Sequence, residues 1–460
     1  MNALIIVLAI LLLSGYGFYL GRGRSVAVSG GDTTNLHSRP NYYGLYVALW
    51  CGIPALMLMI AWMIGEPILV ESLVVSGLSP ETQNLPPEQL GLVLNDVFNL
   101  ARGNITSGTP SPEVQAAADH FNSLNLISRS VLLVLVLAMI IGLLNWARKQ
   151  ITPHLRARNE TEKVIQVLLV LCSVVAILTT FGIVLSLLFE SFRFFQKVPV
   201  TDFLFGLEWS PQTALRKDQV GSSGLFGAIP LMAGTLLISF IAMCIAAPVG
   251  LLAAVYLSEY AAPKVRAVTK PLLEILAGIP TVVYGFFAAL TVAPFMRDTG
   301  GFLGLDISSE SALAAGGVMG IMIIPFVSSL SDDVITAVPR AMREGSYGLG
   351  ATQSETILRV ILPAALPGIV GGVLLAVSRA IGETMIVVMA AGLAANLTAN
   401  PFEAVTTVTV QIVTLLVGDQ EFDSAKTLAA FALGLTLFCV TLVLNVIALT
   451  IVNKYREQYE

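Results

Sequence analysis

The sequence has very little charge for its length. Only 12% of its 460 residues are Asp, Glu, Lys or Arg, whereas 55% are hydrophobic, and its mean hydropathy is +0.81. A water-soluble protein of this size keeps a much larger share of charged residues on its surface. The formal net charge of −5 gives no basic footprint for a nucleic-acid partner. The composition therefore excludes a soluble globular protein and predicts an integral membrane protein.

Cysteine and histidine are scarce as well. All four cysteines, Cys51, Cys172, Cys244 and Cys439, lie inside apolar segments, which is typical of small buried side chains rather than of disulfides or ligands. Only three histidines occur, and none of them is near a cysteine or another histidine. Because zinc sites are built from several such side chains at short spacing, we expect no metal site.

Motifs that would supply a catalytic site or an energy source are absent from the sequence. A P-loop needs a Gly-Lys dipeptide to hold nucleotide phosphates, and the chain contains no such dipeptide. The H-E-x-x-H and G-x-S-x-G patterns of hydrolases are missing too. We therefore expect no enzyme and no cofactor in this chain, and any ATP that drives it must be hydrolysed by a separate subunit.

Long apolar runs, in contrast, are abundant. A helix needs roughly 20 apolar residues to cross a bilayer. Nine stretches meet this requirement: 3–20, 43–65, 124–146, 163–189, 228–258, 270–296, 311–331, 367–391 and 426–452. They predict an all-α membrane protein with about nine transmembrane helices. The alternative for the first stretch is a signal peptide, although its basic residues, Arg22 and Arg24, follow the stretch instead of preceding it.

Basic residues in the connecting segments predict the orientation. With the N-terminus outside, the inside segments hold most of the 25 Lys and Arg residues. These segments are 21–42, 147–163, 259–270, 332–366 and 453–460. Cytoplasmic loops carry an excess of Lys and Arg. We therefore expect a multi-pass protein with its N-terminus outside and its C-terminus in the cytoplasm.

Two outer segments follow from this arrangement. Segment 66–123 contains an apolar stripe at helical spacing from Leu90 to Ala101, and a helix start at Ser111. These features predict two short amphipathic helices packed outside the membrane. Segment 191–227 has no clear periodicity and is expected to be irregular.

The stretch "SRAIGET", residues 378–384, places two charged side chains inside an apolar run. A charge at mid-bilayer costs about 2.5–3.5 kcal/mol on insertion scales, so such residues usually face a bundle interior or a water-filled path. Arg379 and Glu383 are four residues apart, so on a helix they share a face and can pair. Small residues at positions 372, 376 and 380 run along a nearby stripe that suits close helix contact. We expect this face to point inward.

Two interpretations of this pair stay open. One is an inert ion pair that locks two helices. In the other, which we favour, the pair lines a substrate path. Arg379 would then bind a tetrahedral oxyanion, and Glu383 would either hold the arginine in place or accept a proton. Thr281, Ser328 and Ser329 lie beside Gly and Pro breaks in other spans and are further candidates for this path, with ordinary packing kinks as the alternative.

The inner segment 332–366 is too polar to span the membrane. A helix-prone stretch follows Pro339, glycines interrupt it, and a second stretch starts at Thr352 with Glu355 at capping-box spacing. Pro363 is expected to end this second helix before the next span. The pattern predicts a compact knob that docks a soluble partner, and a solvated linker is the alternative.

This loop resembles the EAA motif of ABC importer permeases, which reads E-A-A, three residues, Gly, nine residues, Ile-x-Leu-Pro. The chain has Glu344-Gly345-Ser346, then Gly350, then Val360-Ile361-Leu362-Pro363 at the same spacing. More narrowly, "MREGSYGLGAT", "LPAALPGIV", "SRAIGETM", "AGIPTVVYGFF" and "PVGLLAAVYLSEYA" resemble the PstC-type permease of phosphate ABC importers. The sequence "GETM" favours this subunit over its PstA-type paralogue, which tends to have "GETAP".

The resemblance implies a type I ABC importer permease core at 161–460, with 332–366 as its coupling loop. An N-terminal membrane extension, 1–160, precedes the core, and the resemblance assigns it no role. It further implies a bacterial inner-membrane assembly with a PstA-type permease, two ATPase subunits that bind ATP and Mg, and a periplasmic phosphate-binding protein. Arg379 and Glu383 would act in transport. The residues implied for ATPase coupling are Arg343, Glu344, Gly345, Gly350, Leu362 and Pro363.

Other functions are compatible with parts of this pattern. A secondary anion transporter would need no ATPase, and an ABC permease for sulfate or molybdate would share the inner-loop motif. A membrane-embedded enzyme would require a polar catalytic cluster at an interface, and the sequence shows none.

Overall fold

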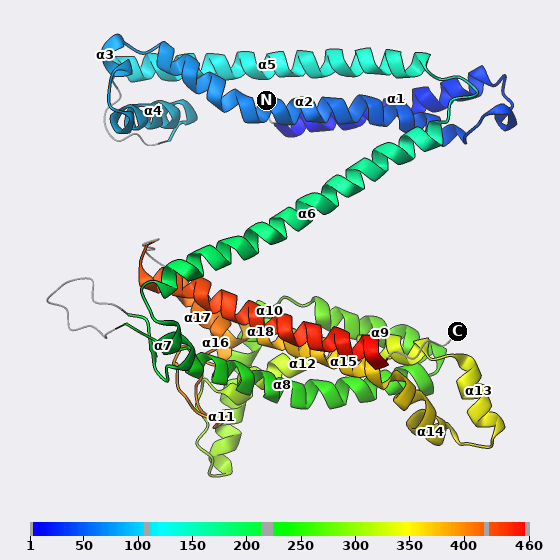
Figure 1. Ribbon diagram of the computed structural model, residues 1–460, viewed down its shortest axis with the longest axis vertical. Helices are drawn as coiled ribbons and strands as arrows, with labels where there is room; N and C mark the ends of the chain where they lie inside the picture. The colour runs from blue at the N-terminus through cyan, green and yellow to red at the C-terminus, as the bar shows by residue number, and fades with distance from the viewer. Residues whose placement is uncertain (1–2, 105–110, 213–223, 418–422, 456–460) are drawn as a thin grey trace. The chain divides into compact units, whose positions relative to one another are not determined.

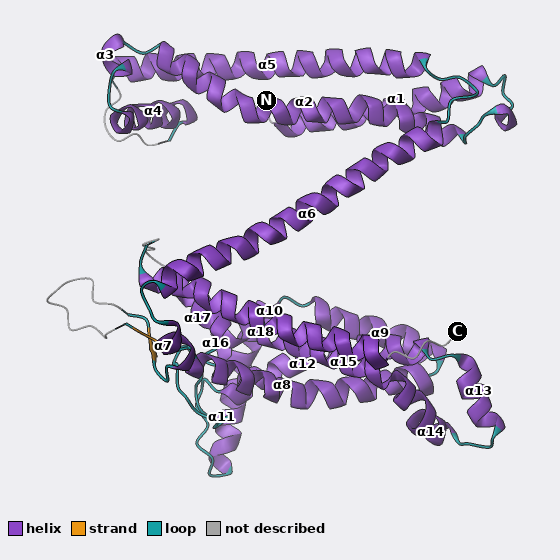
Figure 2. Cartoon of the chain, viewed as in Figure 1, coloured by secondary structure: helices purple, strands orange, loops and turns teal. Residues whose placement is uncertain are grey.

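The protein consists almost entirely of helices (Figure 2). The computed structural model describes residues 3–104, 111–212, 224–417 and 423–455. The chain divides into two compact units, Met1–Leu178 and Thr179–Glu460. The boundary between them falls inside helix α6 (Ala157–Phe195).

The N-terminal unit is built on three long helices that pack along one another (Figure 1). These are α1 (Ala3–Val28), α2 (Pro40–Ser76) and α5 (Pro112–Lys149). Glycine allows α1 and α2 to approach closely, because a Cβ atom at Gly44 would lie only 2.7 Å from the carbonyl oxygen of Phe18. The short elements of the unit are η1 (Thr33–Asn35), α3 (Pro80–Gln83) and α4 (Pro87–Arg102).

Helix α4 confirms the amphipathic helix predicted from the apolar stripe. Leu94 and Val97 are buried, and they belong to one hydrophobic cluster with Ala117 and Ala118 of α5. The helix start at Ser111 is also confirmed, since its side chain accepts a hydrogen bond from the Val114 N–H. The prediction of a second short helix was wrong, because α5 continues without a break into the membrane span. No Gly or Pro follows Pro112 until position 142, so nothing in the sequence ends the helix.

The C-terminal unit contains the remaining helices and one pair of very short strands. Its elements after α6 are α7 (Val200–Phe205), β1 (Trp209–Ser210), β2 (Leu225–Phe226), α8 (Ile229–Val255), η2 (Tyr256–Tyr260), α9 (Pro263–Gly278), α10 (Thr281–Phe287), η3 (Ala288–Val292), α11 (Ala293–Phe302), α12 (Ala312–Ala337), α13 (Arg340–Gly348), α14 (Gln353–Thr356), η4 (Ile357–Ile361), α15 (Leu362–Ile381), α16 (Met385–Ala390), α17 (Val408–Leu416) and α18 (Ala425–Tyr455).

The core of this unit lies between α8, α12, α15 and α16. Small side chains dominate the contact between α8 and α12, where a Cβ atom at Gly320 would lie 2.9 Å from the carbonyl oxygen of Ala242. Lipid tails give little hydrophobic drive to helix association, so close van der Waals packing of small residues holds such helices together. This packing fixes α12 as the central helix, with two-thirds of its most apolar stretch (67%) buried.

The predicted spans agree with the structure except at two places, 270–296 and 367–391, and the second of these breaks between Ile381 and Met385. Eight helices in the described residues are long and apolar enough to cross a membrane. The predicted span 270–296 is not one straight helix. Instead, α9 and the helical segment Thr281–Phe302 meet at an angle of 85°. The break falls at Ile279 and Pro280, and Pro280 can neither donate a helical hydrogen bond nor leave the residue before it helical.

Segment 191–227 is more ordered than predicted in its described part. The strands β1 and β2 pair antiparallel, with Trp209 opposite Phe226. Phe194, Phe203 and Phe226 form edge-to-face contacts with centroids 5.4 to 5.6 Å apart. Aromatic side chains from separate parts of this segment pack together, and helical periodicity in the sequence does not reveal such contacts.

The expectation of buried cysteines holds for one of the four. All four cysteines are free; Cys51 is buried in the N-terminal unit, whereas the other three are exposed on the surface of the chain. Apolar span residues can face lipid instead of a protein core, so position in an apolar run does not imply burial within the chain.

Candidate functional site

The candidate site lies in the C-terminal unit, at the point where one helix ends and the next helix begins. The sequence predicted one continuous helix over 367–391, with Arg379 and Glu383 paired one turn apart. In the structure, α15 ends at Ile381 and α16 begins at Met385. The prediction of a pair was wrong: among the described residues, no ion pair joins the two side chains, because the helical register is lost at Gly382.

Each of the two charges instead lies at a helix end whose partial charge has the opposite sign. Arg379 is in the last turn of α15, where the partial negative charge of the helix dipole favours a cation. The Glu383 carboxylate accepts hydrogen bonds from the N–H groups of Met385 (3.1 Å) and Ile386 (3.5 Å) at the start of α16. The Thr409 hydroxyl donates to the Glu383 carbonyl oxygen at 2.9 Å. The helix break therefore accounts for two charges in an apolar run.

The surroundings of Arg379 differ from those predicted. The close contact of the small-residue stripe is confirmed, since Ala376 and Ala380 are buried in the core and a Cβ atom at Gly372 would lie 3.2 Å from the Leu330 side chain. Arg379 itself is exposed on the surface of the single chain. Its guanidinium carbon lies 5.5 Å from the ring centre of Phe326 on α12, within range of a cation–π interaction. The small residues face the core, and the charge does not.

The hydroxyl candidates do not join this arginine. Ser328 and Ser329 of α12 line a separate cavity of about 20 Å³, together with Lys270 and Asp332. That volume is enough for about one water molecule. Thr281, by contrast, is the first residue of α10, which packs against α16. Ser328 and Ser329 thus lie with charged residues of α9 and α12, whereas Thr281 lies on a different pair of packed helices.

A buried charge cluster beside this cavity was not predicted. Arg266 donates from Nη2 to both carboxylate oxygens of Asp332 at 2.9 Å, and Lys270 Nζ donates to the same carboxylate at 2.8 Å. The Asp332 side chain is only 3% exposed. The sequence offers one signal, an Asp at the end of an apolar run, but nothing in its local spacing pairs Asp332 with the basic residues of segment 259–270.

The inner loop has the predicted helix-turn-helix form. Helices α13 and α14 are separated by a turn in which Gly350 has a φ of +86°, a left-handed conformation that favours glycine. The capping box between Thr352 and Glu355 is present. Glu344 and Gly345 are exposed on α13.

Two other loop residues behave differently. Arg343 is half-buried and donates to Glu259 at 3.0 Å. Pro363 was expected to end a helix, but the helical segment continues from Gln353 to Ile381, and Pro363 stands with Leu362 in the first turn of α15, directly after the π-helical turn η4.

No site for a metal ion emerges in the described ranges. They contain no group of three or more His, Cys, Asp or Glu side chains that could hold one.

Comparisons with known proteins match both units. Residues 7–179 match the family described as phosphate ATP-binding cassette transporter, and residues 246–457 match the family of binding-protein-dependent transport system inner membrane components.

The curated relatives are permeases. The chain is 31% identical over 243 residues to the probable ABC transporter permease protein YqgH of Bacillus subtilis, which covers 52% of this chain and 74% of the relative. It is 31% identical over 264 residues to the phosphate transport system permease protein PstC of Mesorhizobium japonicum (54% and 76%). It is 31% identical over 277 residues to PstC 1 of Mycobacterium tuberculosis (55% and 81%).

Among solved structures, the inward-facing MetNI methionine ABC transporter is 19% identical with a TM-score of 0.37, covering 50% of this chain and 95% of that chain. The matches to the family models and to the curated permeases place the protein: the chain belongs to the PstC-type family of phosphate ABC transporter permeases.

Proposed function

We propose that this chain forms half of the phosphate path of an ATP-driven importer. The observation that carries the proposal is the exposed Arg379 guanidinium at the break between α15 and α16. Its planar fork of donors suits a tetrahedral oxyanion. A face that is exposed on one permease becomes the wall of a path when a second permease packs against it. Glu383 is held by the start of α16, so it would border the path as a fixed negative charge.

The inner loop is proposed as the docking site of a separate ATPase subunit. Glu344 is exposed on α13, and Leu349, at the end of this helix, is 91% exposed. An exposed large apolar side chain beside charged residues is typical of a protein contact surface. The bonds of Arg343 to the transmembrane helices would carry movement of the loop into the membrane part.

The wider assembly is proposed from the family. It contains a second, PstA-type permease, two ATPase subunits that use ATP and Mg, and a periplasmic phosphate-binding protein. The N-terminus lies outside and the C-terminus in the cytoplasm, as the Lys and Arg distribution favours. Thr281 stays a candidate for the path, whereas the cavity beside Ser328 and Ser329 has no room for phosphate in this conformation.

Reconstitution of the chain with its natural partners in proteoliposomes tests this function. ATP hydrolysis and phosphate uptake should both rise when phosphate-loaded binding protein is added. A response to sulfate-loaded or molybdate-loaded binding protein instead would refute phosphate as the substrate. Uptake that proceeds without ATP and stops when an ionophore collapses the ion gradient would identify a secondary transporter.

A further inference from the structure

The N-terminal unit holds a large pocket between α2, α4 and α5, with a volume of about 1030 Å³. Hydrogen bonds fix its walls on one side: Trp62 Nε1 donates to Ser128 Oγ at 3.0 Å, and Ser128 Oγ donates to Glu66 Oε1 at 2.8 Å. On another side, Phe98 of α4 packs against Phe121 of α5 with ring centres 5.0 Å apart. The pocket is therefore built by side chains that hold three helices in place.

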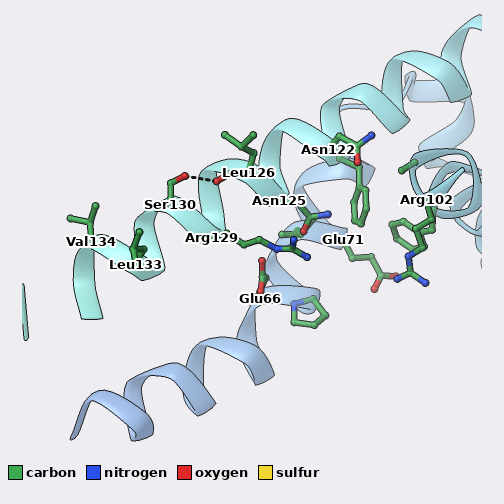
Figure 3. A pocket seen from close by; sticks show the side chains of 15 residues that line it. Glu66, Glu71, Arg102, Asn122, Asn125, Leu126, Arg129, Ser130, Leu133 and Val134 are labelled. Atoms are coloured by element: carbon green, nitrogen blue, oxygen red, sulfur yellow. Dashed lines mark hydrogen bonds between the residues drawn. The ribbon is translucent and has the colours of Figure 1, made fainter. Parts of the chain in front are cut away.

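Charged groups of both signs line this pocket in equal number. Glu66 and Glu71 come from α2, Arg102 is the last residue of α4, and Arg129 comes from α5 (Figure 3). They lie beyond the apolar stretch 43–65 of α2, at the depth where lipid headgroups are expected. Charged groups of both signs around one open cavity can bind a ligand that itself carries both charges.

The other end of the pocket is apolar and open. Leu133 and Val134 lie farther along α5 from the charged groups (Figure 3). At this end, Val134 is 63% exposed. A site with a charged end and an open apolar flank matches an amphiphile with a polar head and a hydrocarbon tail.

We propose that this pocket binds one zwitterionic phospholipid. The guanidinium groups of Arg102 and Arg129 contact the headgroup phosphate, the carboxylates of Glu66 and Glu71 contact the headgroup ammonium, and an acyl chain follows α5 past Leu133. Charge complementarity selects this ligand, because an anionic lipid or free phosphate would leave two carboxylates facing its negative charge. The volume is at the upper end of the range for drug-sized ligands, about 300–1,000 Å³, which leaves room for the headgroup.

Native mass spectrometry of the delipidated full chain tests the proposal. The probes are dioleoylphosphatidylethanolamine, which has an ammonium, and dioleoylphosphatidylglycerol, which has none. The wild type should bind one phosphatidylethanolamine in preference. Glu71→Gln should bind it about tenfold more weakly and phosphatidylglycerol no more weakly, whereas Arg102→Gln should weaken both lipids about tenfold, as expected for the loss of one charged hydrogen bond.

Matched controls carry the same substitutions outside the pocket. Glu81→Gln on α3 and Arg148→Gln at the far end of α5 should leave both affinities unchanged. Circular dichroism and size-exclusion chromatography establish that each variant is folded. If Arg102→Gln does not fold, Glu71→Gln alone decides, because a folding defect would lower the affinity for both lipids while loss of the ammonium contact lowers only one.

Three results would overturn the proposal. The first is equal phosphatidylethanolamine binding by the wild type and both pocket variants. The second is displacement of the lipid by excess inorganic phosphate, which would identify a free-phosphate site. The third is labelling of a protein subunit, rather than lipid, by a photo-crosslinker placed at Leu126 in the assembled complex. None of these results depends on ATP-driven uptake, so this inference and the proposed function can fail independently.

Discussion

Arg343 of α13 and Glu259 of η2 form an ion pair with 3.0 Å between Nη2 and Oε1, although 84 residues separate them in the sequence. The same guanidinium donates to the carbonyl oxygens of Ile335 and Val338 at 2.8 Å each. The side chain of Arg343 is 18% exposed and that of Glu259 is 8% exposed. One arginine thus joins the inner loop to the ends of two transmembrane helices.

Arg343→Ala should loosen the inner loop, because it leaves the Glu259 carboxylate buried without its cation. Breaking a buried pair costs about 3–5 kcal/mol. We expect amide hydrogen exchange in α13 and α14 to accelerate by at least about a hundredfold, as such a loss implies. Arg340→Ala, at an exposed position on the same helix, is the control and should change little. Equal exchange in both variants would show that the pair does not hold the loop.

Arg379→Ala should abolish phosphate uptake while the complex still assembles. The side chain is exposed, so its removal creates no cavity in the core of the chain. Uptake of labelled phosphate into proteoliposomes and the yield of the co-purified complex measure the two effects separately. Arg379→Lys keeps the charge without the bidentate fork and should retain only part of the uptake. Uptake at the wild-type rate by Arg379→Ala would remove this residue from the path.

Glu344→Arg should weaken binding of the ATPase subunit by about tenfold, because it reverses a charge on the proposed docking surface. The residue is exposed, so the stability of the chain should stay within about 0.5 kcal/mol of the wild type. Biolayer interferometry with the purified ATPase measures the affinity. Glu81→Arg, the same charge change in the N-terminal unit, should have no effect. Co-purification of the Glu344→Arg variant at wild-type yield would count against the docking role.

Asp332→Asn should destabilise the contact between α9 and α12 by about 1–3 kcal/mol. The substitution removes a buried negative charge and leaves two cations without their partner. Because Arg266 and Lys270 are about one-third exposed, water screens part of the resulting free-energy cost. Thermal unfolding in detergent detects the change. The neighbouring Asp333 is 66% exposed, so Asp333→Asn should leave the melting temperature almost unchanged. A similar shift for both variants would contradict a special role for the buried carboxylate.

Gly234→Ala should destabilise the C-terminal unit by about 1–3 kcal/mol, the usual cost of overpacking. The added Cβ atom would overlap with the carbonyl oxygen of Thr406, a backbone atom that cannot rotate away. Gly182→Ala is the matched control, because no heavy atom beyond the chain neighbours and the nearby backbone of its own helix lies within 4 Å of a Cβ atom at that position. That control should be neutral or stabilising by up to about 1 kcal/mol, since alanine favours a helix over glycine. Equal melting temperatures for the two variants would contradict this packing.

Most of the membrane spans and the form of the inner loop were predictable from residue patterns alone, whereas the breaks in 270–296 and 367–391 were not. A long apolar run must become a helix in lipid, because every backbone polar group has to be satisfied within the segment. The cap of α14 depends on Thr352 and Glu355, which are three residues apart. Such features need no knowledge of distant neighbours, so the order of residues is sufficient to specify them.

The relationships between distant segments emerged only when the chain was folded. Glu383 looked like the partner of Arg379, yet the helix ends between them, where Glu383 caps α16 and Thr409 of a later segment binds its carbonyl oxygen. Asp332 meets Arg266 only because α9 packs against α12. Ion pairs and cavities depend on which helices become neighbours. That choice results from packing throughout the unit, which local spacing in the sequence does not encode.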